Sequence, residues 1–172
     1  MNAAILAAGF GTLEIVFEAV GPGTHWLAGA KPHDMLDVIG PLGRPFSYPA
    51  EQTICLLIGG GYGAAPLYFL AEELRTRDKL VHMILGARSH DRVFKPIEGK
   101  RLVSSLIIST EDGSMGEPGR VTDLMPQLVE RTGAQVVYAC GPGRRIRRRR
   151  RDRKSTRLNS SHLTQSRMPS SA

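Results

Sequence analysis

The chain has 172 residues, of which 41% are hydrophobic, and its formal net charge at pH 7 is +7. This length suits one domain or slightly more, and no apolar run approaches the ~20 residues that a transmembrane helix needs. Two cysteines, Cys55 and Cys140, are too few for a disulfide framework or for the ligands of an iron–sulfur cluster. We therefore expect a cytoplasmic protein with no membrane partner.

The net positive charge comes from the C-terminal end of the chain. Residues 144–172 hold 11 of the 23 Lys and Arg residues and one of the 16 acidic ones, which leaves 12 basic against 15 acidic residues in 1–143. An arginine block followed by Ser/Thr-rich sequence predicts a disordered tail. Clustered arginine favours non-specific nucleic-acid binding, although no aromatic residue is interleaved for base stacking. The stretch "RKSTRLNSSH" also resembles translated adapter sequence, so a polyanion-binding arm and an adventitious end are both open.

The first fifty residues are β-rich in pattern. Residues 13–20, "LEIVFEAV", are rich in branched and aromatic side chains and predict a strand that ends at the "GPGT" turn. One helical turn fits before Pro32, and residues 35–46 predict a second short strand that ends in a Gly/Pro turn. We expect Trp26 and Phe46 to fill the junction between this part and the rest of the chain.

Residues 53–142 alternate between apolar strand patterns and helix patterns. The predicted strands are short, continuous apolar runs of the kind that are covered on both faces. Strands are expected at 53–58, 79–88, 102–110 and 134–142, helices at 65–77 and 121–133, and a short helix near 91–93. Pro126 either interrupts the second long helix or delays its start, and Gly133 suits its C-cap. The alternation predicts a parallel α/β sheet, whose ligands bind beyond the carboxyl ends of its strands.

A glycine-rich loop, "GGGYGAAP" at 59–66, joins the first of these strands to the first long helix. Its four glycines permit a tight turn and let backbone N–H groups approach an anion at the helix start. Pro66 fits the first helical turn, where its missing N–H costs nothing. The pattern G-x-G-x-x-P lacks the third glycine of the usual dinucleotide fingerprint, so a purely structural turn is the alternative to a phosphate-binding loop.

Loops after the other strands are expected at the same edge of the sheet. Arg88 supplies a cation after the second strand. Glu111 and Asp112, after the third, place carboxylates where an adenosine ribose can be held, which favours NAD over NADP because a carboxylate repels a 2′-phosphate. Cys-Gly-Pro at 140–142 gives a floor of small residues for a flat ring. The structural alternatives are solvated turn carboxylates and a buried thiol.

Four motifs, taken in chain order, resemble a known family. "GGGYGAAP", "GAR", "STEDGSMGEPGRV" and "YACGP" resemble the NAD-binding domain of the ferredoxin-reductase superfamily, and most of all the electron-transfer subunits of NAD-linked dihydroorotate dehydrogenases. "GPGTHWLAGAKPHDMLDVIGPLGRPF" resembles the end of that family's flavin-binding barrel. The likeness covers residues 13–142. Related NAD(P)H–flavin reductases share the last motifs and are the alternative.

The resemblance implies a function and a set of cofactor-binding residues. In that family NADH reduces FAD, and electrons pass through a 2Fe–2S cluster to a partner, the catalytic dihydroorotate dehydrogenase subunit, in pyrimidine biosynthesis. Matching motifs place an FAD-contacting Gly-Thr pair near the start, the NAD pyrophosphate on the glycine loop, the adenosine beside the carboxylates, and the nicotinamide beside the Cys-Gly pair. The implied cofactor-binding residues are Gly23, Thr24, Gly59, Gly60, Gly61, Gly63, Ala64, Arg88, Glu111, Asp112, Cys140, Gly141 and Pro142.

The resemblance also sets the expected organisation. It implies a non-family segment at 1–12, a partial FAD-binding β-barrel at 13–50, a doubly wound NAD-binding α/β domain at 51–143, and a disordered tail at 144–172. The family's earlier barrel strands, its Arg-Pro-x-Ser segment and its cysteine-rich cluster segment have no counterpart in this sequence. We therefore expect a truncated electron-transfer oxidoreductase subunit that binds NAD, has an incomplete FAD site, lacks the 2Fe–2S ligands and is inactive alone.

The first twelve residues offer a second candidate phosphate loop. "AAILAAGFGT" resembles the "LAAGxGTR" loop with which nucleotidyltransferases wrap a nucleoside triphosphate. Leu13 stands where that chemistry needs a cation, a strand follows in place of a helix, and no Asp-x-Asp pair follows for magnesium. We expect no transferase activity and no metal site, since the five histidines also lack metal-ligand spacing. His82 is expected to be a hydrogen-bonded core residue.

Overall fold

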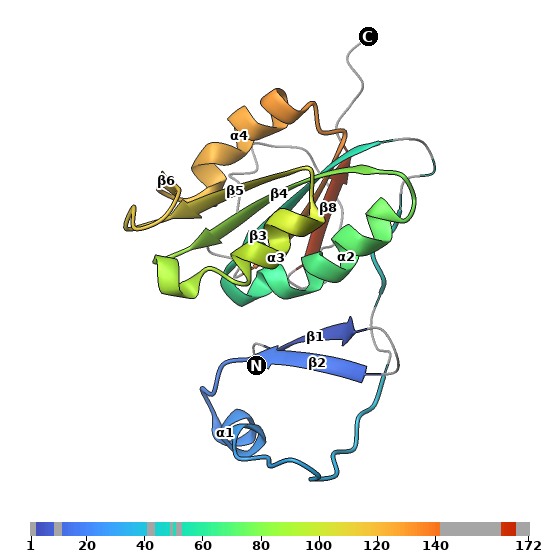
Figure 1. Ribbon diagram of the computed structural model, residues 1–172, viewed down its shortest axis with the longest axis vertical. Helices are drawn as coiled ribbons and strands as arrows, with labels where there is room; N and C mark the ends of the chain where they lie inside the picture. The colour runs from blue at the N-terminus through green and yellow to red at the C-terminus, as the bar shows by residue number, and fades with distance from the viewer. Residues whose placement is uncertain are drawn as a thin grey trace, which may run out of the picture.

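The computed structural model describes residues 3–8, 12–40, 44–48, 50, 53–141 and 163–167. These residues form a six-stranded sheet with helices on both faces and a separate two-stranded hairpin (Figure 1). The elements, with 3₁₀ helices written η, are β1 (Ala3–Ala8), β2 (Thr12–Phe17), α1 (Pro22–Ala28), β3 (Ile54–Gly60), η1 (Gly61–Ala64), α2 (Ala65–Arg75), β4 (Leu80–Ala87), η2 (His90–Arg92), α3 (Pro96–Leu102), β5 (Ser105–Thr110), β6 (Glu117–Pro118), α4 (Val121–Thr132), β7 (Val136–Cys140) and β8 (Leu163–Arg167).

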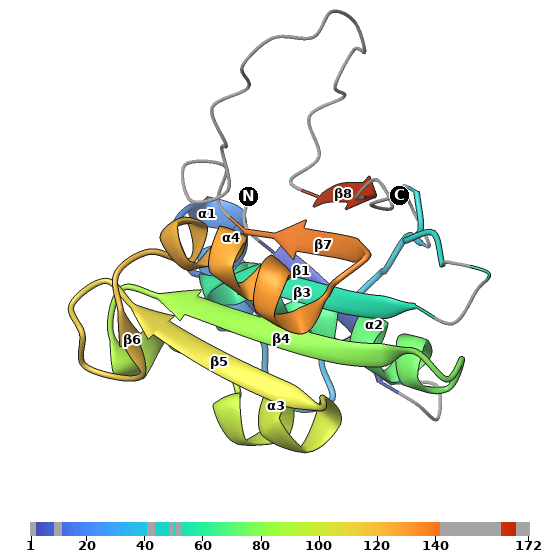
Figure 2. The ribbon, with the colours of Figure 1, turned by 90° about the horizontal axis from the view of Figure 1, so that it is seen from above.

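The large sheet has the strand order β6-β5-β4-β3-β7-β8 (Figure 2). Every neighbouring pair from β6 to β7 is parallel, and β3 lies at the centre, with Ile58 opposite Ile84 of β4 and Ala139 of β7. The parallel α/β sheet predicted from the alternating pattern is confirmed. Because the strands are parallel, the carboxyl ends of β3, β4, β5 and β7 reach one edge of the sheet, where ligands of such folds bind.

Two apolar layers hold this sheet, one on each face. On one face α2 buries Leu67, Leu70 and Leu74 completely, in the same cluster as Leu57 and Tyr138 of the sheet. On the other face α4 covers a second cluster that contains Leu56, Ile58, Ile84 and Leu128. Figure 1 shows α4 on one side of the strands and α2 with α3 on the other. Burial on both faces is why these strands read as continuous apolar runs rather than alternating ones.

The helices agree with the sequence in most places. α4 runs from Val121 through Pro126 without interruption, which settles the choice that the sequence left open, and Gly133 ends it in the left-handed conformation at φ 64°. α3 and the two-residue strand β6 were not predicted. Both are short, and the glycine and proline residues around them obscure any periodic pattern.

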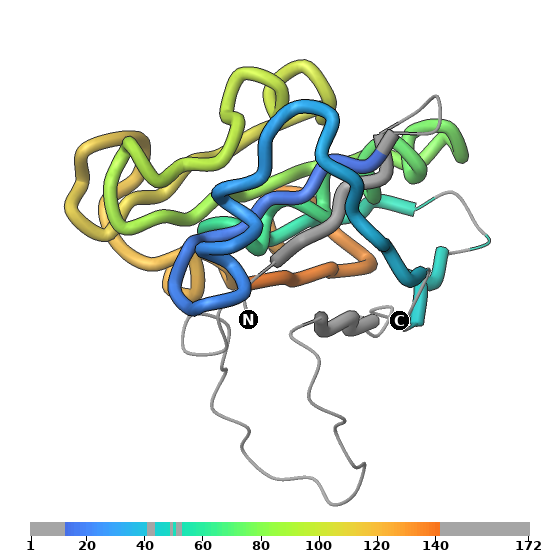
Figure 3. The backbone as a smooth tube through the Cα atoms, turned by 90° about the horizontal axis from the view of Figure 1, so that it is seen from below, coloured from blue at the N-terminus to red at the C-terminus, as the bar shows by residue number. Residues whose placement is uncertain are grey.

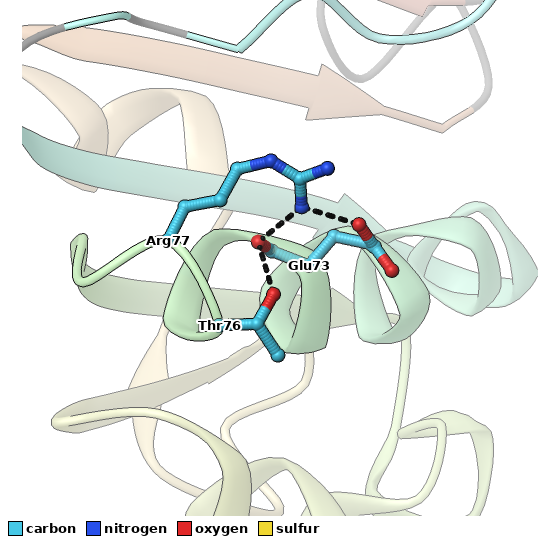
Figure 4. A network of polar contacts seen from close by, with 3 residues as sticks. All are labelled: Glu73, Thr76 and Arg77. Carbon is cyan, nitrogen blue, oxygen red and sulfur yellow. Dashed lines mark hydrogen bonds and ion pairs between the residues drawn. The ribbon is translucent and has the colours of Figure 1, made fainter.

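Side chains hold the C-terminal turn of α2 (Figure 4). The Glu73 carbonyl accepts hydrogen bonds from Thr76 Oγ1 at 2.9 Å and from Arg77 Nη1 at 2.8 Å, and Arg77 also pairs with the Glu73 carboxylate. The Arg77 guanidinium lies 4.2 Å from the centre of the Tyr48 ring. Arg77, which holds the end of the helix, therefore also contacts the segment at 44–48 that precedes β3.

The N-terminal part differs from expectation in two places. The described residues of 35–46 form no strand, and Met35 and Ile39 are 95% and 83% exposed, because no neighbouring strand among the described residues pairs with them. Trp26 is 70% exposed and so does not fill the junction. Phe46 does: its ring meets Tyr138 edge to face, with centroids 5.8 Å apart.

Residues 3–8, placed outside the family part of the sequence, are joined to that part by strand pairing. β1 pairs antiparallel with β2, from Ala3 opposite Phe17 to Ala8 opposite Thr12. Two ion pairs connect this hairpin region with the segment after β4: Lys95 to Glu14 at 2.7 Å and Arg92 to Glu18 at 3.7 Å. Figure 3 shows the N-terminal part crossing beneath the sheet domain.

Part of the predicted disordered tail also forms a strand. β8 pairs antiparallel with β7, with Ala139 opposite Thr164, and so satisfies backbone groups at an edge that β7 would otherwise expose. The tail residues at 144–162 and 168–172 lie outside the described residues. Within the described part of the chain, no helix has the length and apolar character needed to span a membrane.

His82 corrects a further expectation. It lies on β4 between Leu56 of β3 and Ser105 of β5, and its buried Nδ1 has no hydrogen-bond partner among the described residues. Burial lowers the pKa of His82, because the charged imidazolium loses hydration there. The residue is a partly buried histidine with an unsatisfied Nδ1, and not the hydrogen-bonded core residue that was expected.

This burial predicts a loss of stability in acid. Above about pH 6.5, the usual histidine pKa, both folded and unfolded chains hold neutral His82; below it the unfolded chain binds a proton that the folded chain disfavours. The free energy of unfolding, measured by urea titration at pH 7.5 and 5.5, should fall with pH in the wild type and fall less in His82→Leu. The exposed His90, changed to Gln, serves as control. An equal pH dependence in wild type and His82→Leu would contradict the assignment.

Candidate functional site

The loop between β3 and α2 has the predicted strand–turn–helix form. β3 ends at Gly60, η1 spans Gly61–Ala64, and α2 follows with Pro66 in its first turn. Gly61 has φ 57°, a left-handed conformation that favours glycine. The loop thus turns sharply at the carboxyl end of the central strand and leads directly into the helix.

Two other glycines of the loop are required by packing. A Cβ on Gly63 would lie 2.5 Å from the Cα of Gly141, and one on Gly59 would lie 2.7 Å from the Cβ of Ala64. On the other side of the contact, a Cβ on Gly141 would lie 3.1 Å from the Cα of Gly60. The structure therefore brings the glycine loop and the end of β7 together, as the sequence predicted. The absence of side chains at Gly59 and Gly63 is explained by the fold itself.

A cleft opens beside this loop, on the α4 side. It joins the ends of β3 and β4 to the turn after β5 and to the start of α4, and its lining residues are Ile58, Gly60, Gly86, Ala87, Glu111, Gly119, Arg120 and Val121. A Cβ on Gly86 would lie 1.9 Å from Val121 Cγ2, so the missing side chain at Gly86 lets α4 approach the strand. Gly60 and Glu111 had been predicted at the site, whereas Arg120 and Val121 had not.

The two predicted carboxylates have different roles. Asp112 Oδ1 accepts hydrogen bonds from the Ser114 backbone N–H at 3.0 Å and the Ser114 hydroxyl at 2.6 Å, and these bonds lower the pKa of Asp112. The Ser114 hydroxyl in turn accepts a bond from the His90 backbone N–H at 2.8 Å. Asp112 therefore holds the turn, while Glu111 lines the cleft.

Arg88 lies just beyond the cleft. It is exposed and follows Ala87, the last residue of β4, which does line the cleft. Its backbone carbonyl accepts a hydrogen bond from the Asp112 N–H at 3.1 Å. The structure thus brings Arg88 close to the predicted carboxylates through the backbone, without placing it among the lining residues.

Cys140, the first residue of the predicted Cys-Gly-Pro floor, carries a neutral thiol. It is buried at the end of β7, opposite Gly59 of β3, and burial raises its pKa to about 11. At neutral pH the thiol is therefore protonated and is a poor nucleophile. Pro142, also predicted at the site, lies outside the described residues.

The predicted FAD-contacting pair lies elsewhere, in α1. The Thr24 hydroxyl accepts bonds from the backbone N–H groups of Val20 and Gly21, at 3.0 and 3.1 Å, and donates one to the Gly21 carbonyl. A Cβ on Gly23 would meet no atom within 4 Å. Figure 1 places α1 on the far side of the β1–β2 hairpin from the large sheet. The structure does not bring this pair together with the other predicted site residues.

No family model matches the chain, but several known proteins are similar to it. The dihydroorotate dehydrogenase B (NAD(+)) electron transfer subunit of Desulforamulus reducens is 37% identical over 133 residues, which cover 77% of this chain and 51% of that protein. The subunit of the same name from Fusobacterium nucleatum is 41% identical, covering 74% and 51%, and that of Geobacillus thermodenitrificans is 40% identical, covering 74% and 49%.

The chain is similar to these electron transfer subunits. The resemblance predicted from its motifs is confirmed, and the chain spans about half the length of the curated relatives it matches.

Solved structures support the same fold. An NADH-dependent reduced ferredoxin-NADP oxidoreductase matches with a TM-score of 0.60 and 30% identity, covering 73% of this chain and 53% of that one. The cytochrome b5 reductase domain of Ulva prolifera nitrate reductase, at 19% identity and a TM-score of 0.57, covers 71% and 54% and shows the fold alone. The expected fold class, a parallel α/β sheet of ferredoxin-reductase type, is confirmed.

The packing of the glycine loop predicts a marked difference between two glycine substitutions. Gly63→Ala should lower the free energy of unfolding by about 1–3 kcal/mol, because the added methyl meets the Gly141 backbone, which cannot move aside like a side chain. Gly23→Ala should leave stability unchanged or slightly higher, since its methyl enters open space within a helix. Urea unfolding of the two variants tests this, and equal stabilities would contradict it.

Proposed function

We propose that this chain binds NAD(H) along the carboxyl edge of its sheet, as the dinucleotide-binding part of an electron-transfer oxidoreductase subunit. The observation that carries the proposal is the strand–turn–helix loop, with Gly61 in the left-handed conformation, beside a cleft that contains Glu111. A tight turn between a strand and the start of a helix suits a pyrophosphate, because backbone N–H groups at a helix start bind anions. The electron transfer subunits that resemble the chain support the same class of ligand, since their names include NAD(+).

Each part of the dinucleotide then has proposed contacts. The pyrophosphate lies on the loop from Gly59 to Ala64, with Arg88 as a nearby cation. The adenosine ribose faces Glu111, which favours NAD over NADP, and Asp112 supports this side by holding the turn. The nicotinamide lies against the end of β7, at 140–142, where the protonated Cys140 thiol adds no charge.

The residues described around Gly23 and Thr24 do not enclose a flavin ring. The Thr24 hydroxyl is used in capping α1, Gly23 faces open space, and the neighbouring Trp26 is exposed, so nothing there encloses a ring system. Nor do the cysteines suit a 2Fe–2S cluster, because Cys55 and Cys140 lie on different strands and burial raises the pKa of each thiol to about 11.

The electron acceptor is proposed from the relatives. Their name supports a catalytic dihydroorotate dehydrogenase subunit as partner, and with it a place in pyrimidine biosynthesis. A related NAD(P)H–flavin reductase is the second candidate, favoured by the 30% identity to the NADH-dependent ferredoxin-NADP oxidoreductase. We also propose a cytoplasmic location, because both cysteines are free thiols.

NADH binding is the direct test. With NADH at a hundred times its Kd, the free energy of unfolding should rise by about 2.7 kcal/mol, seen as a higher melting temperature. ADP-ribose, which keeps the pyrophosphate and adenosine, should retain most of the effect. Arg131→Ala, an exposed substitution at the other end of α4, should respond like the wild type. An unchanged melting temperature at millimolar NADH and ADP-ribose would contradict the proposal.

A further inference from the structure

Arg120 is an exposed cation on the cleft that the fold does not use. It is the N-cap residue of α4 and lines the cleft, and its backbone carbonyl accepts a hydrogen bond from the Asp123 N–H at 2.9 Å. Within the described part of the chain, its guanidinium makes no ion pair or hydrogen bond. By contrast, Arg77 and Lys95 are each paired with a carboxylate. The Arg120 guanidinium is thus available to an anionic ligand.

Glu111 lines the same cleft with the opposite charge. Its backbone N–H donates to the Ala87 carbonyl at 3.1 Å, which fixes the residue beside the end of β4. A carboxylate accepts a hydrogen bond from a ribose 2′-hydroxyl and repels a 2′-phosphate, whereas a guanidinium binds phosphate through two parallel hydrogen bonds. The cleft therefore holds one group that selects against a 2′-phosphate and one that suits it.

The backbone between the two residues is fixed at both ends. The Ser109 hydroxyl donates to the Gly119 carbonyl at 2.7 Å, and the Thr110 hydroxyl bonds both backbone groups of Met115, at 2.8 and 2.9 Å. At the far end, the close fit of Val121 against Gly86 seats α4 on the strand. Glu111 and Arg120 are consequently held on one cleft by the fold, so the removal of one charge leaves the other in place.

We propose that Arg120 is a phosphate-binding residue whose action on the adenosine ribose is opposed by Glu111. With both residues present, the cleft selects a dinucleotide that carries a free 2′-hydroxyl. Without the Glu111 charge, Arg120 binds a 2′-phosphate and the chain accepts NADP(H). This inference rests on the proposed binding of NAD(H) at the same cleft.

Arg88 is the competing cation. It is exposed at the same edge of the sheet, but it follows the last lining residue of β4. If Arg88 were the group that receives a 2′-phosphate, its removal, and not that of Arg120, would lower the affinity for NADPH more than the affinity for NADH. The two arginines can therefore be separated by single substitutions.

The test compares NADH and NADPH affinities, by fluorescence titration, in the full chain and its variants. Glu111→Gln should raise the NADPH affinity on the order of tenfold, which is about 1.4 kcal/mol, with a smaller change for NADH. Adding Arg120→Ala to Glu111→Gln should remove that gain, whereas adding Arg131→Ala, on the same helix but away from the cleft, should not. Circular dichroism melting of each variant verifies that the fold is kept.

Two results would overturn the inference. One is a gain in NADPH affinity that survives Arg120→Ala, or that Arg88→Ala removes while leaving NADH affinity unchanged; the other is a Glu111→Gln variant that binds NADH but gains nothing for NADPH. Failure of the proposed function looks different, since neither NADH nor ADP-ribose would then bind the wild type. The Arg120 variants therefore test the inference once the wild-type chain has been found to bind NADH.

Discussion

The carboxyl edge of the sheet depends on a backbone contact that admits no side chain, between Gly63 and Gly141. This contact seats the β3–α2 loop on the end of β7, which is the direct neighbour of the central strand β3. It places a turn with a left-handed Gly61 beside a buried, neutral Cys140. A second close contact, of the Val121 side chain against Gly86, brings α4 to the cleft. The site is therefore shaped by close packing at glycine residues, and its charged residues, Glu111 and Arg120, line the cleft beside them.

The sheet domain could be read from the sequence because its strands are buried on both faces. β3, β4, β5 and β7 appear as continuous apolar runs, and α2 shows leucines at helical spacing, so local pattern and tertiary burial agree. The segment at 35–46 shows the limit of such reasoning. Its apolar residues suit a strand, but a strand forms only where a partner supplies hydrogen bonds, and sequence pattern carries no information about the partner.

The sequence predicts those site residues that directly follow a strand. It does not predict residues that the fold brings to the site from elsewhere in the chain. The glycine loop and Glu111 follow strands directly, so topology places them. Arg120 follows a turn held by three hydrogen bonds, and no spacing rule brings that turn back to β4. Adjacent carboxylates present the opposite difficulty. The two carboxylates are adjacent in the sequence, and their roles differ because of the hydrogen bonds to Ser114. These bonds make Asp112 part of the turn, whereas Glu111 lines the cleft.

The exposed apolar residues of the N-terminal part also bear on how the chain behaves in concentrated solution. Met35, Val38 and Ile39 lie on one short segment that is largely open to water. Apolar segments with unpaired backbone are sites at which chains associate with one another. Association between chains is therefore expected at this segment rather than at the sheet, whose apolar residues are enclosed between its helices.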